Sequence, residues 1–311
     1  MNIGQWRPAL AVLLLSVGWA DAAPLNIIFY GNSFTFGAGS SRPVDSIFRD
    51  IATIAGHERP YTISAASSGQ DLEWHVNNNT QRITSSILPG NNWDHIVLQE
   101  HSTKLTRAYP DSPPFPASVE ESKTTAVELF NVAKQHSPGV TPVLYETWAR
   151  GPGHAFYTGA NPLFSGPAEM QAEIRAGYDA LQEALDTDAG QQQTLLAPVG
   201  DAWREANYDN LHATDLWHAQ NRGSLLAALV IYGTIYGDTN TSALDLTQRR
   251  VLDSLNLTEA DGAFLTAAAD ATLRAENVPE PCSAAVVIGM LTVAAACRQA
   301  APTKRGVGVA P

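Results

Sequence analysis

The chain has 311 residues, of which 44% are hydrophobic and 16% are charged. This composition excludes an intrinsically disordered chain and a protein with many membrane spans, so we expect one large globular domain or two smaller ones. The formal net charge of −12 argues against nucleic-acid binding, and two cysteines can build neither a disulfide framework nor a four-thiolate zinc site.

The first 22 residues have the pattern of a secretory signal. One basic residue, Arg7, precedes an uncharged apolar run, and Ala20 and Ala22 supply the small residues of a cleavage step. The run is too short to span a membrane and lacks an amphipathic period, and the alternative is a first core helix. We expect residues 1–22 to be removed on export, leaving residues 23–277 as one domain.

From residue 24 to residue 237, short apolar runs alternate with longer amphipathic stretches. This alternation predicts a parallel sheet with crossover helices. The expected strands are residues 25–30, 61–66, 95–99, 142–146 and 194–198. The expected helices are residues 44–55, 119–135, 168–185, 222–236 and 259–275. Segments 109–116 and 151–166, rich in Pro, Gly and Ser, should form loops at the strand ends where ligands bind in such sheets.

A candidate nucleophile follows the first expected strand. In Gly31-Asn32-Ser33 the serine can expose its hydroxyl at the edge of the sheet, beside backbone N–H groups that could face an oxyanion. Taken alone, the same residues are equally typical of an ordinary turn that caps a helix.

A nucleophilic serine needs a base, and the base needs an orienting acid. Asp215 and His218 have a spacing that can bring a carboxylate and an imidazole to one side of a loop. Asp209 and His212 repeat this spacing six residues earlier. The spacing alone therefore leaves both pairs open, and a solvated loop histidine is the alternative for either.

Polar residues follow the other expected strands as well. Gln99 and Glu100 follow the third strand, and the Gln99 amide has the NH₂ donor that an oxyanion hole requires. The alternative is a strand-end glutamine bonded to loop backbone. Glu146, Trp148 and Arg150 follow the fourth strand, where an aromatic ring beside an acid and a base would suit a sugar, unless they simply pack there.

The end of the chain has the features of a second address signal. Pro279-Glu280-Pro281 precedes an apolar stretch and dispersed basic residues. Residues 278–311 thereby resemble the bacterial PEP-CTERM sorting tail, which implies transient membrane association, processing by an exosortase-type enzyme and release to the cell surface or an extracellular matrix. A plain membrane anchor and a packed tail helix are the alternatives. Cys282 and Cys297 both lie in this tail, so a processed protein would contain no cysteine.

Taken in order, the polar blocks resemble those of the SGNH (GDSL-like) hydrolases. That family has its active serine in a Gly-Asp/Asn-Ser block, a glycine after the second strand, an asparagine after the third and Asp-x-x-His near the end. The resemblance spans residues 25–236 and implies a three-layer, flavodoxin-like α/β/α fold with a parallel sheet of about five strands. Gly69 matches the second block, but Gln99 stands where the family has asparagine.

The resemblance implies a catalytic triad of Ser33, His218 and Asp215. The family has a helix after its Asp-x-x-His block, and the glycine-containing helix expected after His218 therefore favours His218 over His212 as the base. The oxyanion would be held by the N–H groups of Ser33 and Gly69 and by the Gln99 side chain.

We therefore expect an exported serine esterase that cleaves small acyl esters, including O-acetyl groups on an acylated glycan, through an acyl-enzyme. Asn32, Glu100, Glu146 and Trp148 are the further candidates for the substrate cleft. No dinucleotide or phosphate-loop motif and no zinc spacing is present in the sequence, so neither a cofactor nor a metal is expected. An inactive protein of the same fold that binds glycan or matrix, and a membrane-anchored protein with an uncut tail, remain the alternatives.

Overall fold

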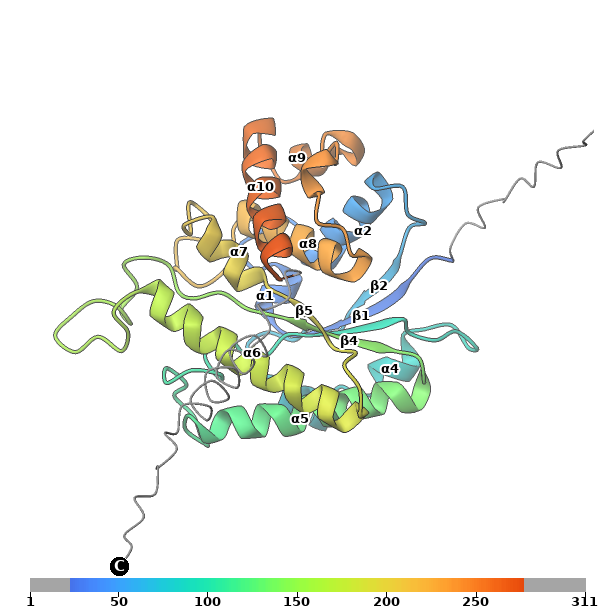
Figure 1. Ribbon diagram of the computed structural model, residues 1–311, viewed down its shortest axis with the longest axis horizontal. Coiled ribbons are helices and arrows are strands. Elements are labelled where there is room, and N and C mark those ends of the chain that lie inside the picture. Colours follow the sequence, from blue (N-terminus) through green and yellow to red (C-terminus); the bar gives the residue numbers. More distant parts are fainter. Residues whose placement is uncertain (1–22, 277–311) are drawn as a thin grey trace, which may run out of the picture.

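The computed structural model describes residues 23–276, in which helices cover both faces of a parallel sheet (Figure 1). The expected signal, residues 1–22, and the expected sorting tail, residues 278–311 with Cys282 and Cys297, lie outside the described residues. None of the helices within residues 23–276 combines the length and the hydropathy that crossing a membrane would require.

Five parallel strands form the sheet in the order β2-β1-β3-β4-β5. The strands are β1 (Asn26–Tyr30), β2 (Tyr61–Ser64), β3 (His95–Leu98), β4 (Thr141–Tyr145) and β5 (Leu195–Ala197). Ile28 of β1 pairs with Ile63 of β2 on one side and with Ile96 of β3 on the other. The strand order reverses between β1 and β3, and in such sheets ligands bind beyond the carboxyl ends of the strands at that point.

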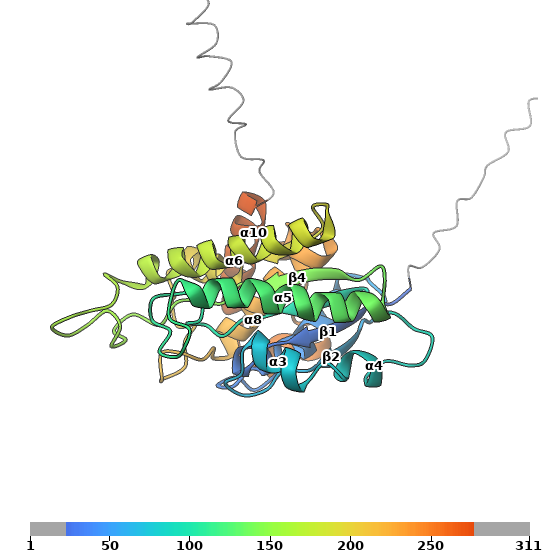
Figure 2. The same cartoon turned by 90° about the horizontal axis from the view of Figure 1, so that it is seen from below.

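Successive strand residues point to opposite faces of the sheet, so each face has its own core. Ile27 and Phe29 belong to the core under α2, α7, α8, α9 and α10, whereas Ile28 and Tyr30 belong to the core under α3, α4, α5 and α6. Figure 1 shows the first group above the sheet and α5 and α6 below it, and Figure 2 shows α5 beside α6. The α-helices are α1 (Ser33–Phe36), α2 (Val44–Ile54), α3 (Leu72–Asn78), α4 (Arg82–Ser85), α5 (Ala117–His136), α6 (Pro167–Ala189), α7 (Val199–Glu205), α8 (Asn221–Tyr236), α9 (Val251–Ser254) and α10 (Glu259–Glu276), with 3₁₀ turns η1 (Thr241–Ala243) and η2 (Gln248–Arg250).

The expected three-layer, flavodoxin-like α/β fold is confirmed. Every expected strand and helix is present within residues 23–276, with ends that differ slightly from the expected ones. The helices α4, α7 and α9 were not predicted, and no bounds were predicted for α1 and α3. Each has seven residues or fewer, too few to show an amphipathic period in the sequence.

The start of α8 packs unusually close to α7. A Cβ on Gly223 would lie 2.5 Å from a ring carbon of Trp203 and 2.6 Å from the carbonyl oxygen of Leu211. Real side chains do not tolerate such separations from backbone and a buried indole, so only glycine fits here. This close approach fixes where the segment that precedes α8, with His218, can lie.

We expect Gly223→Ala to lower the free energy of unfolding by about 1–3 kcal/mol, because the added methyl group must displace a buried ring or the backbone. Gly262→Ala in α10 is the matched control, since the nearest atoms to a Cβ there would be methyl groups of Leu252, at 3.3 and 3.4 Å, and of Leu246, at 3.7 Å. The gain in helix propensity should offset that contact and keep the change within about 1 kcal/mol. Urea unfolding of both variants measures the difference, and a Gly223→Ala protein as stable as Gly262→Ala would contradict the close-packing argument.

Candidate active site

Ser33 begins α1 directly beyond the carboxyl end of β1. The side-chain oxygen of Asn32 accepts a hydrogen bond from the Phe34 N–H at 3.1 Å and so caps this short helix. The residue before Asn32 must be glycine, because a Cβ on Gly31 would lie 2.3 Å from Oγ1 of Thr35. The turn therefore holds Ser33 at the edge of the sheet, where the sequence pattern placed it.

Ser33, His218 and Asp215 form a continuous chain of hydrogen bonds. Oγ of Ser33 lies 2.9 Å from Nε2 of His218, and Nδ1 of His218 lies 2.6 Å from Oδ2 of Asp215. The other carboxylate oxygen of Asp215 accepts hydrogen bonds from the N–H groups of Trp217 and His218, at 2.8 and 3.0 Å. Burial opposes ionisation of Asp215, but these hydrogen bonds outweigh it and lower its pKa to about 2. The carboxylate stays charged at neutral pH and directs the Nδ1–H of His218 towards itself, which leaves Nε2 to accept the serine proton.

The competing histidine, His212, points elsewhere. Its Nε2 lies 2.9 Å from the carbonyl oxygen of Ala149, and burial lowers its pKa to about 4. The neutral ring therefore donates Nε2–H to the segment that follows β4. His212 and Ala219 form a single antiparallel bridge that closes the loop carrying Asp215 and His218. The two histidines thus have separate positions, and only His218 reaches Ser33.

A cavity of about 540 Å³ lies over Ser33 and His218, and Asn32 and Gly69 also line it. The backbone N–H groups of Ser33 and Gly69 have no acceptor within residues 23–276. Gly69 has a φ of +70°, a conformation that favours glycine. Two unpaired N–H donors beside a serine hydroxyl are what a tetrahedral oxyanion requires.

Gln99 does not lie where its expected role as an oxyanion donor would place it. The side chain is fully buried, and its oxygen accepts hydrogen bonds from the Asn32 N–H at 2.9 Å and from the Thr35 hydroxyl at 3.0 Å. Its NH₂ group donates to the carbonyl oxygen of Glu100 at 2.5 Å and is not directed at the cavity. Because the Asn32 N–H can only donate, the oxygen of the amide must face it. Gln99 therefore supports the nucleophile turn from behind.

Three other cleft candidates also lie beneath the cavity and do not line it. Glu100, Glu146 and Trp148 are fully buried, whereas Asn32 does line the cavity. The Glu146 carboxyl accepts hydrogen bonds from the Gln171 side chain and the Asp201 N–H, and burial together with Asp201 raises its pKa to about 8. These buried side chains position the segments around the site.

Arg150, from the same segment, does reach the cavity. The sequence places Arg150 in one segment with Glu146 and Trp148 and does not indicate which of the three side chains lines the cavity. Which side chain faces the cavity depends on how the chain bends after β4. Two hydrogen bonds hold this bend, from the Ala149 N–H to the Gln171 side chain at 2.8 Å and from the Gly151 N–H to the carbonyl oxygen of Leu216 at 2.9 Å.

His75 is a supporting residue that the motifs did not reveal. It is fully buried in α3, and its Nε2 lies 2.7 Å from the carbonyl oxygen of Gly31. Burial lowers the pKa of His75, so the ring is neutral, and Nδ1 accepts from the side chain of Asn79 at 3.1 Å. The ring therefore donates Nε2–H to the nucleophile turn. In the sequence, only the closeness of His75 to Gly69 indicates that it could belong to the site.

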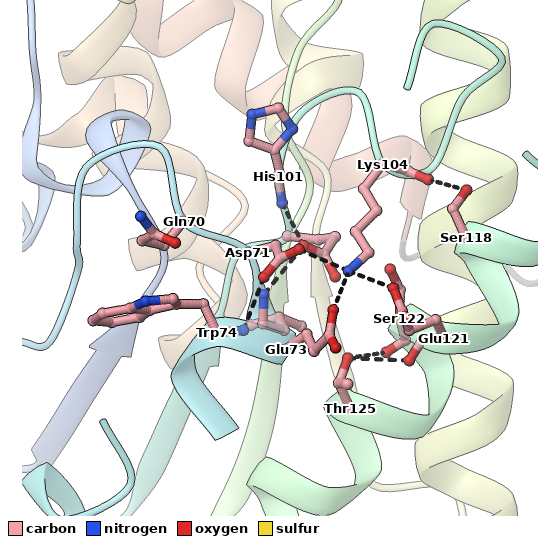
Figure 3. Close-up of polar contacts among 12 residues, drawn as sticks. Gln70, Asp71, Glu73, Trp74, His101, Lys104, Ser118, Glu121, Ser122 and Thr125 are labelled. Atoms are coloured by element: carbon pink, nitrogen blue, oxygen red, sulfur yellow. Dashed lines mark hydrogen bonds and ion pairs between the residues drawn. The ribbon is translucent and has the colours of Figure 1, made fainter. Parts of the chain in front are cut away.

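A buried ion-pair network holds the loop that carries Gly69 (Figure 3). Nζ of Lys104 lies 2.7 Å from Asp71 and 2.8 Å from Glu121 of α5, and its side chain is fully buried. Asp71 also caps α3 through the Trp74 N–H at 2.8 Å. Burial alone would lower the pKa of Lys104, but the surrounding carboxylates raise it. The charged lysine thus ties the start of α3 to the loop after β3 and to α5.

Within residues 23–276, no three His, Cys, Asp or Glu side chains gather in a way that could hold a metal ion.

We expect His218→Gln to lower kcat by about 10³-fold or more, because glutamine cannot take the serine proton. The same substitution at His212 is the matched control, since glutamine can still donate to the carbonyl oxygen of Ala149. Steady-state hydrolysis of 4-nitrophenyl acetate by both variants measures the effect. A larger loss in His212→Gln would reverse the assignment of the two histidines.

Lys104→Met should lower the free energy of unfolding by about 2 kcal/mol or more, because it removes the buried cation that Asp71 and Glu121 share, although both carboxylates keep some contact with solvent. Lys123→Met is the matched control in α5. Lys123 pairs with Glu120 at 2.9 Å on the surface, where such a pair contributes about 1 kcal/mol or less. Urea unfolding compares the two variants, and equal losses would show that the buried network does not hold the Gly69 loop.

No protein-family model and no curated protein matches this chain. Among solved structures it is similar to a DUF4886 family protein from Bacteroides uniformis, with 17% identity and a TM-score of 0.57 over 83% of this chain and 98% of that one. A candidate SGNH hydrolase from Slackia heliotrinireducens is 24% identical, with a TM-score of 0.49 over 68% of this chain and 99% of that one. A lipase/acylhydrolase from Enterococcus faecalis is 16% identical, with a TM-score of 0.46 over 68% and 96%. At 17% identity, the similarity to the Bacteroides protein shows a shared fold.

Proposed function

We propose that this protein is a serine ester hydrolase of the SGNH (GDSL-like) type. One observation carries the proposal, namely the hydrogen-bonded chain from Ser33 through His218 to Asp215, of which Ser33 and His218 line a cavity. The order of the sequence blocks supports the same family. An inactive protein that only binds glycan would have no need of a paired serine and imidazole, so the geometry favours catalysis.

In the acylation step, Oγ of Ser33 attacks the ester carbonyl carbon while its proton moves to Nε2 of His218. The carbonyl oxygen becomes an oxyanion that accepts hydrogen bonds from the Ser33 and Gly69 N–H groups. The imidazolium that forms is stabilised by the Asp215 carboxylate, whose pKa is lowered to about 2 and which therefore remains charged. The tetrahedral intermediate then collapses, the bond to the alcohol oxygen breaks, and His218 gives its proton to the leaving alkoxide.

Deacylation runs through the same groups. His218 takes a proton from water, and the water oxygen attacks the acyl carbon of the Ser33 ester. Collapse of the second oxyanion breaks the bond to Oγ, which recovers its proton from His218. Acid and alcohol are the products, and the proton balance closes without a cofactor.

As substrates we propose small acyl esters, including O-acetyl groups on carbohydrate. The cavity of about 540 Å³ has the size of a small-molecule site. The sequence patterns of residues 1–22 and 278–311 support export, with exosortase-type processing and final location at the cell surface or in an extracellular matrix. An enzyme in that location meets acylated glycans.

We expect Ser33→Ala to abolish labelling by a fluorophosphonate probe and to lower kcat on 4-nitrophenyl acetate by about 10³-fold or more. The probe forms a bond from phosphorus to Oγ as fluoride leaves, so it reports directly on an activated serine. Mass spectrometry of the labelled protein identifies the modified residue.

Ser85→Ala, at an exposed position in α4, is the matched control and should label like the wild type. Labelling that persists in Ser33→Ala would refute the proposed nucleophile. A folded wild-type protein that neither labels nor hydrolyses any short acyl ester would instead support the inactive, glycan-binding alternative.

A further inference from the structure

Arg150 is a buried cation that lacks an ion-pair partner among residues 23–276. The residue is only 4% exposed, and its guanidinium lies over the rings of Trp217, Phe34 and Phe156, at 5.2, 6.0 and 6.0 Å from their centroids. Its Nε and Nη1 atoms are buried and have no hydrogen-bond acceptor. An arginine in this state leaves strong donors unused.

Such an arrangement is costly, because a buried charge is normally paired. Burial lowers the pKa of Arg150 to about 10, so the guanidinium remains protonated at neutral pH. Other arginines of the described chain show the usual solution. Arg107, Arg175 and Arg222 each contact at least one carboxylate. The aromatic rings offset part of this cost, but no carboxylate of residues 23–276 pairs with Arg150, which points to a ligand.

Arg150 lines the same cavity as Ser33 and His218. The negative charge of Asp215 raises the pKa of Arg150 without an ion pair between them. The Asp215 carboxylate already accepts hydrogen bonds from His218 and from two backbone N–H groups. Asp111 also lines the cavity, but it is exposed to solvent and forms no ion pair with Arg150. Nη2, the guanidinium nitrogen that is not among the buried atoms, is therefore the one that a molecule in the cavity can reach.

We propose that Arg150 is the specificity residue of this cavity and binds a carboxylate of the ester substrate, separate from the ester bond that is cleaved. This inference rests on the proposed ester hydrolysis. A charged guanidinium N–H is a strong donor to a carboxylate, and the surrounding aromatic rings exclude water, which strengthens the pairing. The substrate class is thus an acyl ester with a carboxylate on its alcohol or acyl part, such as an acylated uronic-acid unit of an acidic glycan.

Two matched pairs of esters test the preference and locate the carboxylate. 4-Acetoxybenzoate and 4-acetoxybenzamide differ in charge on the alcohol side, and 4-nitrophenyl hydrogen adipate and 4-nitrophenyl hexanoate differ on the acyl side. In at least one pair, the wild type should favour the anionic ester by about 10- to 100-fold in kcat/KM, the range expected for hydrogen bonds to a charged group. Arg150→Met should lose most of that ratio.

Arg107→Met is the matched control, since Arg107 also lies over an aromatic ring, 5.1 Å from the centroid of Phe164, but pairs with Glu173 and does not line the cavity. It should keep the wild-type ratio. Arg150→Met should melt no lower than the wild type, because an unpaired buried charge is replaced by an apolar chain of similar length. A lower melting temperature with an unchanged ratio would assign Arg150 a structural role and overturn the inference.

A binding measurement separates this inference from the proposed function. 4-Hydroxybenzoate, or adipate for the acyl side, should raise the melting temperature of Ser33→Ala but not that of the double variant Ser33→Ala/Arg150→Met. If no ester is hydrolysed, the proposed function fails, and this binding test still decides whether Arg150 is a carboxylate site. Equal losses in Arg150→Met for both members of each pair would instead make Arg150 an oxyanion donor and refute its role in substrate selection.

Discussion

Phe34, Trp148 and Trp203 stack face to face, with ring centroids 4.3 and 4.1 Å apart and nearly parallel planes. They come from the nucleophile turn, the segment after β4 and α7, so one stack joins three segments that are distant in the sequence. Trp148 also donates its indole N–H to the carbonyl oxygen of Trp217 at 2.9 Å, and the Phe34 ring meets His218 edge-on at 5.6 Å. The distance between Ser33 and His218 therefore depends on the packing of these rings and on one partly buried hydrogen bond, and the close packing of the buried rings leaves them little freedom to move.

The opposite wall of the site is held by charge. Lys104 binds Asp71, and Asp71 caps α3 two residues beyond Gly69. The Glu100 carboxylate adds hydrogen bonds from the N–H groups of Leu72 and His101, at 3.2 and 2.6 Å. An oxyanion donor must not move as charge develops, and a buried ionic network is costly to rearrange. The nucleophile and the oxyanion loop are thus fixed by different forces from the two faces of the sheet.

The sequence was sufficient to predict the sheet, the long helices and the positions of Ser33, Asp215 and His218. The sheet, the long helices and Ser33 depend on local pattern, since a strand that leads into a turn must place its next residues at the sheet edge. The choice of Asp215 and His218 over Asp209 and His212 came from the family resemblance, because the spacing alone left both pairs open. Gln99 shows where local pattern fails. Its amide has the chemistry of an oxyanion donor, but the close approach of Gly31 and the N–H of Asn32 draw its oxygen inward, away from the cavity.

For a related reason, the sequence could not separate Arg150, which lines the cavity, from Glu146 and Trp148, which do not. All three follow one strand, and their burial is decided by partners far away in the sequence, namely Gln171, Trp203 and Trp217. No periodicity in the segment itself encodes which side chain reaches the cavity. The buried contacts of His75 and Lys104 were likewise not predictable, because the role of a buried polar side chain is recognised only once the groups that satisfy it are known.

The chain has a net charge of −12, yet the buried ionisable side chain in the cavity wall that lacks an ion-pair partner is Arg150. The two facts do not conflict. Surface charges are screened over about 8 Å at physiological salt, whereas a charge enclosed by aromatic rings is screened much less. Phe34 contributes to that enclosure and also contacts His218 and Trp148. One ring thus helps the fold tolerate an unpaired cation and also contacts His218. The proposed substrate-binding cation and the proposed catalytic base therefore share one buried neighbour.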